Sequence, residues 1–227
     1  MICNQTRQEL AGVNAIESPG TVFVVDDDEE FRNTVAGILR AAGLGVEAYA
    51  SPVGLLQSPQ PDLLGCYLLD LQLPEMSGLE LCKRLYGKGC RQPFIVLSGR
   101  GDISTALDAM RLGAVDFIEK PFNHARLLDT VQKAIERDVS ARCQRAEQLV
   151  LERKLSKLTA RETEVLECVV LGRLSKQIAI ELAISPKTVE VHRSRIMKKL
   201  EVDSLAQLLH LMNKHSVRSE KGRKADA

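Results

Sequence analysis

Five polar side chains in this sequence stand at the ends of apolar segments, and their types suit the chemistry of phosphate groups. They are Asp26, Asp27, Asp70, Ser98 and Lys120. Carboxylates held a few ångströms apart repel one another, so such a cluster requires a cation, a proton or exposure to water. Carboxylate oxygens suit a hard divalent cation, Mg2+ most readily. We therefore predict a magnesium site wherever folding brings these residues together.

A carboxylate beside Mg2+, a hydroxyl and a lysine can accept a phosphoryl group, because the metal and the ammonium neutralise the phosphoryl oxygens. Asp70 is the best candidate nucleophile and would form an acyl phosphate. Asp26 and Asp27 would arrange the metal, while Ser98 and Lys120 would bind the phosphoryl oxygens. Each residue taken alone also has an ordinary explanation. The acidic cluster fits a solvated turn, Ser98 fits a serine at the end of a strand, and Lys120 fits a surface lysine.

An enzyme is the alternative interpretation. Asp26 and Asp28 have the spacing of the paired aspartates in a haloacid-dehalogenase-like phosphatase. That pattern predicts a small Thr or Val two residues after the second aspartate, but Glu30 stands there. Phosphatase assays on generic esters would distinguish the two interpretations.

The segments around these residues predict an α/β fold. Strand-like apolar runs occupy residues 22–25, 46–49, 66–70, 94–98 and 115–119, and helix-period segments separate them. Five strands alternating with helices indicate a parallel sheet covered on both faces. The carboxyl ends of such strands share one edge, where ligand sites form. Gly43, Gly87 and Gly113 stand where helices are expected to end.

The rest of the chain predicts a helical linker and an all-α unit of four helices. Residues 125–158 contain neither Gly nor Pro and carry an intermittent apolar face, which favours one long helix. Its charged second half fits a linker, and its heptad pattern is too irregular to establish a coiled coil. Thr159 and Glu162 have the spacing of a capping box, and Ser185 followed by Pro186 fits a helix start.

The composition, 44% hydrophobic and 27% charged over 227 residues, is that of a globular protein. No apolar run reaches the roughly 18 residues of a membrane span, and the first residues lack the layout of a signal peptide. We therefore expect a cytoplasmic protein without a membrane partner.

The six cysteines have no paired spacing, which predicts neither disulfides nor a thiolate metal site. Residues 156–227 carry a net charge of +5 and residues 1–155 a net charge of −4, so the second part suits a polyanion.

One predicted helix, residues 186–200, is suited to DNA. Val189, Ile196 and Leu200 fall on one side at helical spacing and are expected to face a core. The opposite side carries short, polar and basic side chains: Lys187, Val191, Ser194 and Lys198. A helix of this kind fits the major groove of duplex DNA. The sequence has no Trp and few other aromatic residues, so it offers no stacking platform for single strands.

The segments "VVDDDEEFR", "LLDLQLPEMSGLEL", "IVLSGRGD" and "GAVDFIEKPF" resemble the receiver domain of two-component response regulators, over roughly residues 20–140. The resemblance implies a doubly wound, five-stranded parallel sheet with the flavodoxin-like strand order 2-1-3-4-5. It implies that Asp70 is the phospho-acceptor. It also implies Mg2+ ligands from Asp27 directly, Asp26 through water, Asp70, and the backbone carbonyl of Gln72.

The same resemblance assigns the switch residues. Ser98 would be the switch hydroxyl, Phe117 the switch aromatic residue and Lys120 the phosphoryl-binding lysine, with a cis Lys120–Pro121 peptide bond. Arg100 stands where small or polar residues are often seen, which leaves the lifetime of the phosphoryl group open.

Residues 156–216 resemble the LuxR-type helix-turn-helix domain, so the whole chain resembles a NarL/FixJ-type response regulator. By this resemblance Glu190, Val191 and Ser194 face the bases. Candidates for phosphate contacts are Lys176, Lys187, Thr188, His192, Arg193 and Lys198. Glu190 would either accept a hydrogen bond from a cytosine amine or form a salt bridge with a basic neighbour. His192 would either contact DNA or lie half-buried.

The combined resemblance predicts a phosphorylation-dependent transcriptional regulator and not an enzyme. Its expected partners are a sensor histidine kinase, duplex DNA at promoter sites, a second copy of the chain after phosphorylation, and RNA polymerase. A phosphorylation-independent DNA-binding protein with an inert receiver is the further alternative. The predicted boundaries are an extension at 1–20, the receiver at 21–139, a helical linker at 140–155, the DNA-binding domain at 156–216 and a polar tail at 217–227.

Overall fold

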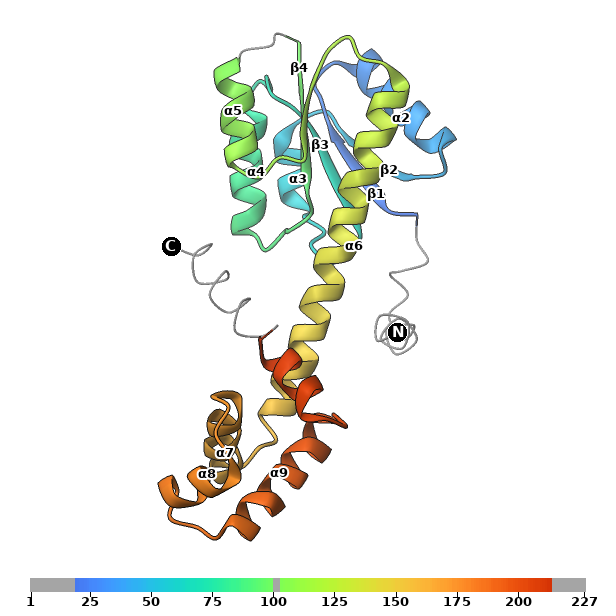
Figure 1. Ribbon diagram of the computed structural model, residues 1–227. Coiled ribbons are helices and arrows are strands. Elements are labelled where there is room, and N and C mark those ends of the chain that lie inside the picture. The colour runs from blue at the N-terminus through green and yellow to red at the C-terminus, as the bar shows by residue number, and fades with distance from the viewer. Residues whose placement is uncertain (1–18, 100–102, 214–227) are drawn as a thin grey trace. The chain divides into compact units, whose positions relative to one another are not determined.

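The structure is a computed structural model that describes residues 19–99 and 103–213 (Figure 1). The chain forms two compact units, Met1–Cys143 and Gln144–Ala227. The predicted extension up to residue 18, Arg100 and the predicted tail at 217–227 lie outside the described residues.

Five parallel strands form a single sheet in the first unit. They are β1 (Thr21–Val25), β2 (Gly45–Tyr49), β3 (Gly65–Asp70), β4 (Phe94–Ser98) and β5 (Asp116–Glu119). Their order is β2-β1-β3-β4-β5, and all four neighbouring pairs run parallel. The predicted fold class and strand order are therefore confirmed, and the carboxyl ends of all five strands lie at one edge.

Helices cover both faces of the sheet (Figure 1). Helices α2 (Glu29–Ala41) and α6 (His124–Leu155) pack on one face, and α3 (Pro52–Gln57), α4 (Gly78–Gly87) and α5 (Ile103–Arg111) pack on the other. Because successive side chains of a strand point to opposite faces, β1 contributes to both cores. Val22 and Val24 join the core beneath α2 and α6, whereas Phe23 and Val25 join the core beneath the other three helices.

Local signals account for several helix ends, with one correction. Asp28 begins α2 by accepting a hydrogen bond from the backbone N–H of Phe31 at 3.0 Å. Gly43 and Gly113 adopt the left-handed backbone expected after a helix. The predicted capping role of Gly87 was wrong, because Gly87 is the last residue of α4 and the left-handed glycine after the helix is Gly89, with φ of 87°.

The second unit contains α7 (Ala160–Val170), α8 (Ser175–Glu181), α9 (Pro186–Leu200) and a further helical segment at 205–213. The predicted capping box of Thr159 and Glu162 begins α7, and Ser185 with Pro186 begins α9, as the sequence indicated. One core holds buried residues from α7, α8 and α9, among them Val165, Ile178 and Ile196. The four-helix unit predicted from the sequence is thus confirmed. Among the described helices, none has both the length and the apolar character needed to cross a membrane.

Gly65 provides a test of the sheet geometry. A Cβ atom at this position would overlap the carbonyl oxygen of Thr21 on the neighbouring strand. We expect Gly65→Ala to destabilise the first unit by about 2 kcal/mol or more, because a central parallel pair would have to separate. All three tyrosines lie in this unit, so tyrosine fluorescence during urea unfolding of the full chain follows it selectively.

Gly37→Ala is the matched control. Gly37 is exposed in the middle of α2, and its added Cβ would meet nothing within 4 Å. Alanine is expected to stabilise the helix there by about 0.5–1 kcal/mol. Equal effects of the two substitutions would contradict the close approach of β1 and β3.

Candidate functional site

The carboxyl-end edge of the sheet gathers the predicted polar residues. Asp26 directly follows β1, Asp70 ends β3, Ser98 ends β4 and Lys120 directly follows β5. Asp26, Asp70 and Ser98 are buried, with exposed fractions of 0%, 8% and 1%, whereas Asp27 is exposed. Buried carboxylates require partners, because low-dielectric surroundings disfavour an isolated charge.

The three aspartates can share one cation. One carboxylate oxygen from each of Asp26, Asp27 and Asp70 lies within 4.8 Å of the others. Backbone N–H groups orient two of these carboxylates. Asp28 donates to Asp26 Oδ1 at 3.0 Å, and Gln72 donates to Asp70 Oδ1 at 2.8 Å. An oxygen-only donor set of this size, open to water on the Asp27 side, fits a hard divalent ion such as Mg2+.

Lys120 bridges two of the carboxylates. Its Nζ donates to Asp26 Oδ2 at 2.6 Å and to Asp70 Oδ2 at 2.5 Å. Its backbone N–H donates to the carbonyl oxygen of Ser98 at 2.7 Å, which ties the segment after β5 to the end of β4. The peptide bond between Lys120 and Pro121 is cis, as the resemblance implied. One ammonium thus balances part of the negative charge gathered at this edge.

The pKa values of this pair reflect burial and mutual attraction. Burial raises the pKa of Asp26 and the charge of Asp70 raises it further, while the hydrogen bond from Lys120 lowers it in part. Burial alone would lower the pKa of Lys120, but its hydrogen bonds to Asp26 and Asp70 outweigh burial, so the pKa is raised. The ammonium therefore stays charged at neutral pH, and any additional cation would relieve the cost of ionising Asp26.

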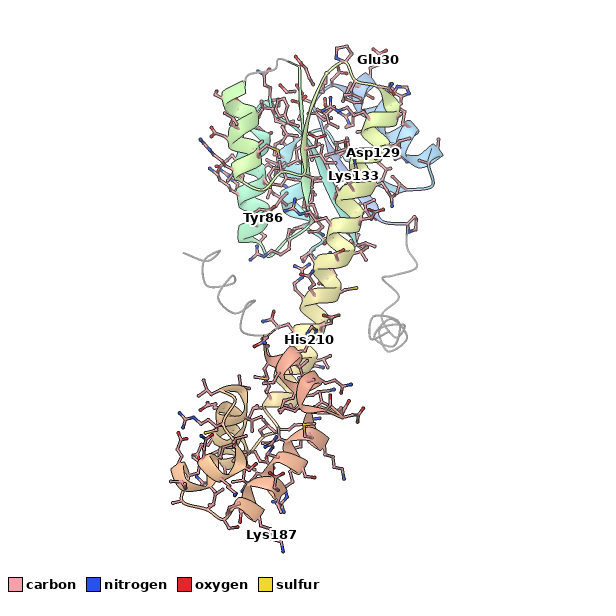
Figure 2. The ribbon with its side chains drawn as sticks, viewed as in Figure 1. Glu30, Tyr86, Asp129, Lys133, Lys187 and His210 are labelled. Carbon is pink, nitrogen blue, oxygen red and sulfur yellow. The ribbon has the colours of Figure 1, made fainter. Side chains whose placement is uncertain are left out.

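The first turn of α2 adds two residues that the sequence analysis did not single out. The ring of Phe31 lies beneath the Lys120 ammonium, with 3.9 Å between Nζ and the ring centroid. Arg32 donates from Nη1 to the backbone carbonyl of Asp26 at 2.7 Å. Because Asp28 caps α2, residues three and four positions later are turned back toward the end of β1. Figure 2 labels Glu30, which lies in the same first turn.

Phe117 lies in the middle of β5, away from the carboxylates along the strand. It pairs with Val96 of β4 and packs, partly buried, against the core beneath α3, α4 and α5. Gly78 begins α4 close to Asp70, since a Cβ there would overlap the carbonyl oxygen of Asp70. The start of α4 is thus packed closely against the backbone of Asp70.

A second candidate site lies on α9. Val189, Ile196 and Leu200 are buried, as predicted for the inward side of the helix. The exposed side chains include Lys187, Glu190, Val191, Ser194 and Lys198. Lys176, at the start of α8, is also exposed, and Thr188 is half-buried. The helix therefore presents a basic, polar surface opposite its packed side.

Glu190 is engaged within the unit. Its Oε1 accepts a hydrogen bond from the Ser175 hydroxyl at 2.5 Å and lies 3.9 Å from Arg193 Nη1. Arg193 Nη1 also donates to the Ser175 hydroxyl at 2.9 Å. The salt-bridge alternative for Glu190 is therefore the arrangement seen here, and Ser175 is a member that sequence reasoning missed. His192 is half-buried, and its buried Nδ1 has no hydrogen-bond partner within the described part of the chain.

Glu162 joins the start of α7 to the end of α9. Its carboxylate accepts hydrogen bonds from the backbone N–H of Thr159 at 2.8 Å and from Lys199 Nζ at 2.6 Å. The bond from Lys199, followed by that from Thr159, lowers the pKa of Glu162 to about 2. This ion pair connects α9 to the start of α7, beside the core that α9 also enters.

Known proteins match both units. The model of the response regulator receiver domain matches residues 22–132, and that of bacterial regulatory proteins of the luxR family matches residues 156–212. Transcriptional regulatory protein FixJ from Azorhizobium caulinodans is 38% identical over 190 residues, which cover 84% of this chain and 90% of that protein. Nodulation protein W from Bradyrhizobium diazoefficiens is 39% identical over 190 residues, 84% of each chain. A solved structure of the response regulator StyR is 41% identical, with a TM-score of 0.75, covering 86% of this chain and 98% of that one.

The Glu162–Lys199 pair predicts an acid-sensitive second unit. The pKa of Glu162 is lower in the folded state, about 2, than its ordinary value of 4.5. The folded state therefore binds fewer protons, and the stabilisation is present above about pH 4.5 and lost as the pH falls toward 2. Glu162→Gln is expected to lower the free energy of unfolding at pH 7 by about 1–3 kcal/mol and to remove this dependence. Amide hydrogen exchange in α7 and α9, followed by NMR at a series of pH values, measures both effects.

Glu164→Gln is the control, because Glu164 forms an exposed pair with Arg161 on the same helix. Its effect is expected to stay within about 0.5 kcal/mol. If Glu162→Gln kept the acid dependence of the natural chain, the assigned cause would be wrong.

Proposed function

This chain belongs to the response regulators that join a receiver domain to a luxR-family DNA-binding domain, and on that premise we propose that phosphorylation of Asp70 controls its binding to duplex DNA. The family is one of transcription regulators, so the phosphatase interpretation is not retained. The observation that carries the proposal is the convergence of three carboxylates and Lys120 on one edge of the sheet.

The proposed acceptor reaction uses Asp70 as nucleophile. One of its carboxylate oxygens attacks the phosphorus of a phosphohistidine on a sensor histidine kinase. The new P–O bond forms as the P–N bond breaks, and the imidazole leaves with the bonding electron pair. Lys120 is already within 2.5 Å of Asp70 Oδ2, so its ammonium can pair with a phosphoryl oxygen without a large movement. Ser98, at the end of the adjacent strand, is proposed to bind a second phosphoryl oxygen.

Asp26, Asp27 and Asp70 fit a divalent cation by donor type and spacing, with the Gln72 backbone carbonyl as a further proposed ligand. When bound, Mg2+ would supply positive charge to the transferring phosphoryl oxygens. Asp26 has the strongest need for such a partner, because it is fully buried and its pKa is raised.

The proposed response to phosphorylation is a two-state change in the receiver. Ser98 would move toward the phosphoryl group, and Phe117 would turn inward from its partly buried position on β5. We propose that the changed surface of α5, β5 and α6 favours a dimer, which binds paired half-sites on promoter DNA in the cytoplasm and acts on RNA polymerase.

The proposed DNA contacts follow the exposed side of α9. Glu190, Val191 and Ser194 would face bases, and Lys176, Lys187, Thr188, Arg193 and Lys198 would contact phosphates. Of these, Lys187 is labelled in Figure 2, at the amino-terminal end of α9. His192 is the weakest of the predicted contacts, because its Nδ1 is buried within the unit.

Replacement of the acceptor tests the proposal directly. Acetyl phosphate with Mg2+ is expected to phosphorylate the natural chain and to increase its affinity for target DNA. Asp70→Asn keeps the shape of the side chain but removes the nucleophilic oxygen, so we expect no incorporation and no change in affinity. Mass spectrometry of the intact protein and DNA-binding titrations on genomic fragments measure the two results.

Asp62→Asn is the control, because Asp62 is an exposed aspartate that precedes β3, at the edge of the sheet opposite Asp70, and belongs to none of the elements of the proposed dimer surface. It should behave like the natural chain. Equal gains in DNA affinity for the natural chain and Asp70→Asn would favour a DNA-binding protein with an inert receiver.

The basic side of α9 predicts a salt-dependent affinity. Lys187→Ala is expected to reduce the slope of log affinity against log salt concentration by about 1, since one phosphate contact is lost. The loss should be similar on specific and unrelated duplexes, because phosphate contacts carry no base information. Fluorescence anisotropy at several salt concentrations measures the slope.

Lys83→Ala serves as the comparison, since this exposed lysine lies on α4 in the first unit, outside the proposed dimer surface. An unchanged slope for Lys187→Ala, or an equal reduction for Lys83→Ala, would remove α9 from the proposed interface.

A further inference from the structure

Phe31, which lies outside the predicted site, contacts Lys120 directly. Its ring lies 3.9 Å from the Lys120 ammonium, measured to the centroid. The side chain of Lys120 is only 18% exposed, so the ring and the ammonium meet in partly desolvated surroundings. A cation over the face of an aromatic ring is attracted by the ring quadrupole, more strongly where water is excluded.

The orientation of this ring is set from two elements. Phe31 belongs to the first turn of α2, whose start is held by the Asp28 cap. Phe122, which follows the cis Lys120–Pro121 bond by one residue, meets the Phe31 ring edge-on, with centroids 5.7 Å apart and planes at 85°. This is a favourable aromatic geometry. The face of Phe31 is therefore presented to Lys120 by a helix cap and an aromatic contact, neither of which uses the carboxylate oxygens that bind Lys120.

That independence matters when charges at the site change. The two oxygens that bind Lys120 belong to Asp26 and Asp70, which are also proposed to bind the cation and to accept the phosphoryl group. Each of those events draws carboxylate charge away from the ammonium. The aromatic face is a ligand for neither Mg2+ nor phosphate, so its attraction for Lys120 persists through both.

We propose that Phe31 is a positioning residue for phosphoryl transfer, and that its ring keeps the Lys120 ammonium within reach of Asp70 while the carboxylates exchange partners. The proposal rests on the proposed function of Asp70 and extends it to a residue of α2. Lysine has a long side chain with many rotamers, so a third contact restricts it to the conformations useful for the reaction.

The competing explanation is that Phe31 only fills space above the core beneath α2 and α6. In that case an apolar side chain of similar volume would serve equally well. The two explanations differ for Phe31→Leu, which keeps an apolar group but has no ring. They differ again for Phe31→Tyr, which keeps the ring face and adds a polar hydroxyl.

The first measurement is NMR of the metal-free full chain with labelled lysine. The methylene protons of Lys120 nearest the ammonium should be shifted upfield by the ring in the natural chain and in Phe31→Tyr. They should return to the ordinary position for lysine in Phe31→Leu. An ordinary position in the natural chain would overturn the proposal, because the ring would not then contact Lys120.

The second measurement is the rate of phosphorylation by acetyl phosphate at saturating Mg2+. We expect Phe31→Leu to react about 2- to 30-fold more slowly than the natural chain, the rate equivalent of one cation–π contact, and Phe31→Tyr to react within about 2-fold of it. Equal rates for Phe31→Leu and the natural chain, or equal slowing of both variants, would overturn the proposal. Tyrosine fluorescence during unfolding, with Phe31→Leu compared with the natural chain, shows whether both are folded.

The outcomes separate this inference from the proposed function. If the natural chain takes no phosphoryl group, the function of Asp70 and the role of Phe31 both fail. If the natural chain is phosphorylated on Asp70 and Phe31→Leu keeps its rate, only the role of Phe31 fails.

Discussion

A single ammonium group, that of Lys120, holds together two carboxylates that end separate strands of the sheet. Asp26 and Asp70 are buried, and two negative charges so close would disfavour the folded state without a compensating cation. The strands that carry them are apolar and fully packed, so they cannot move apart to relieve the repulsion. The site therefore combines a rigid backbone with negative charge that Lys120 neutralises only in part. An added cation or a phosphoryl group changes the net charge of the site more readily than it moves the backbone.

The contacts of Lys120 extend beyond the carboxylates. Its backbone is bonded to the end of β4, and its side chain lies over Phe31 at the start of α2. A change of charge at Asp70 therefore acts on Lys120, and through it on β4, on the segment after β5 and on α2. Each of these contacts of Lys120 is shorter than 4 Å. Physical connection of this kind is what a receiver requires if chemistry at one carboxylate is to alter a distant surface.

Much of the fold and part of the site could be predicted from the sequence. Parallel strands place their carboxyl ends at one edge, so locating the strands was enough to bring Asp26, Asp70, Ser98 and Lys120 together. Partners that depend on the phase of a helix or on packing between helices could not be found this way. To predict the contacts of Phe31 and Arg32, the start of α2 must be known to within one residue. To predict the hydrogen bond from Ser175 to Glu190, the packing of α8 on α9 must be known. The left-handed glycine that follows α4 was misplaced by two residues, because Gly87 is still helical and Gly89 adopts the left-handed backbone.

The hydrogen bonds among Ser175, Glu190 and Arg193 tie the proposed base contact of Glu190 to the internal packing of the second unit. The Ser175 hydroxyl accepts a hydrogen bond from Arg193 and donates one to Glu190. Replacing Glu190 therefore removes the acceptor of Ser175 and the carboxylate beside Arg193. A descendant of this protein that altered its operator through residue 190 would therefore carry a compensating substitution at residue 175 or 193. Among relatives, residues 175, 190 and 193 should therefore change together. Single substitutions on the exposed side of α9 would give fewer new operator sequences than the number of exposed side chains there suggests.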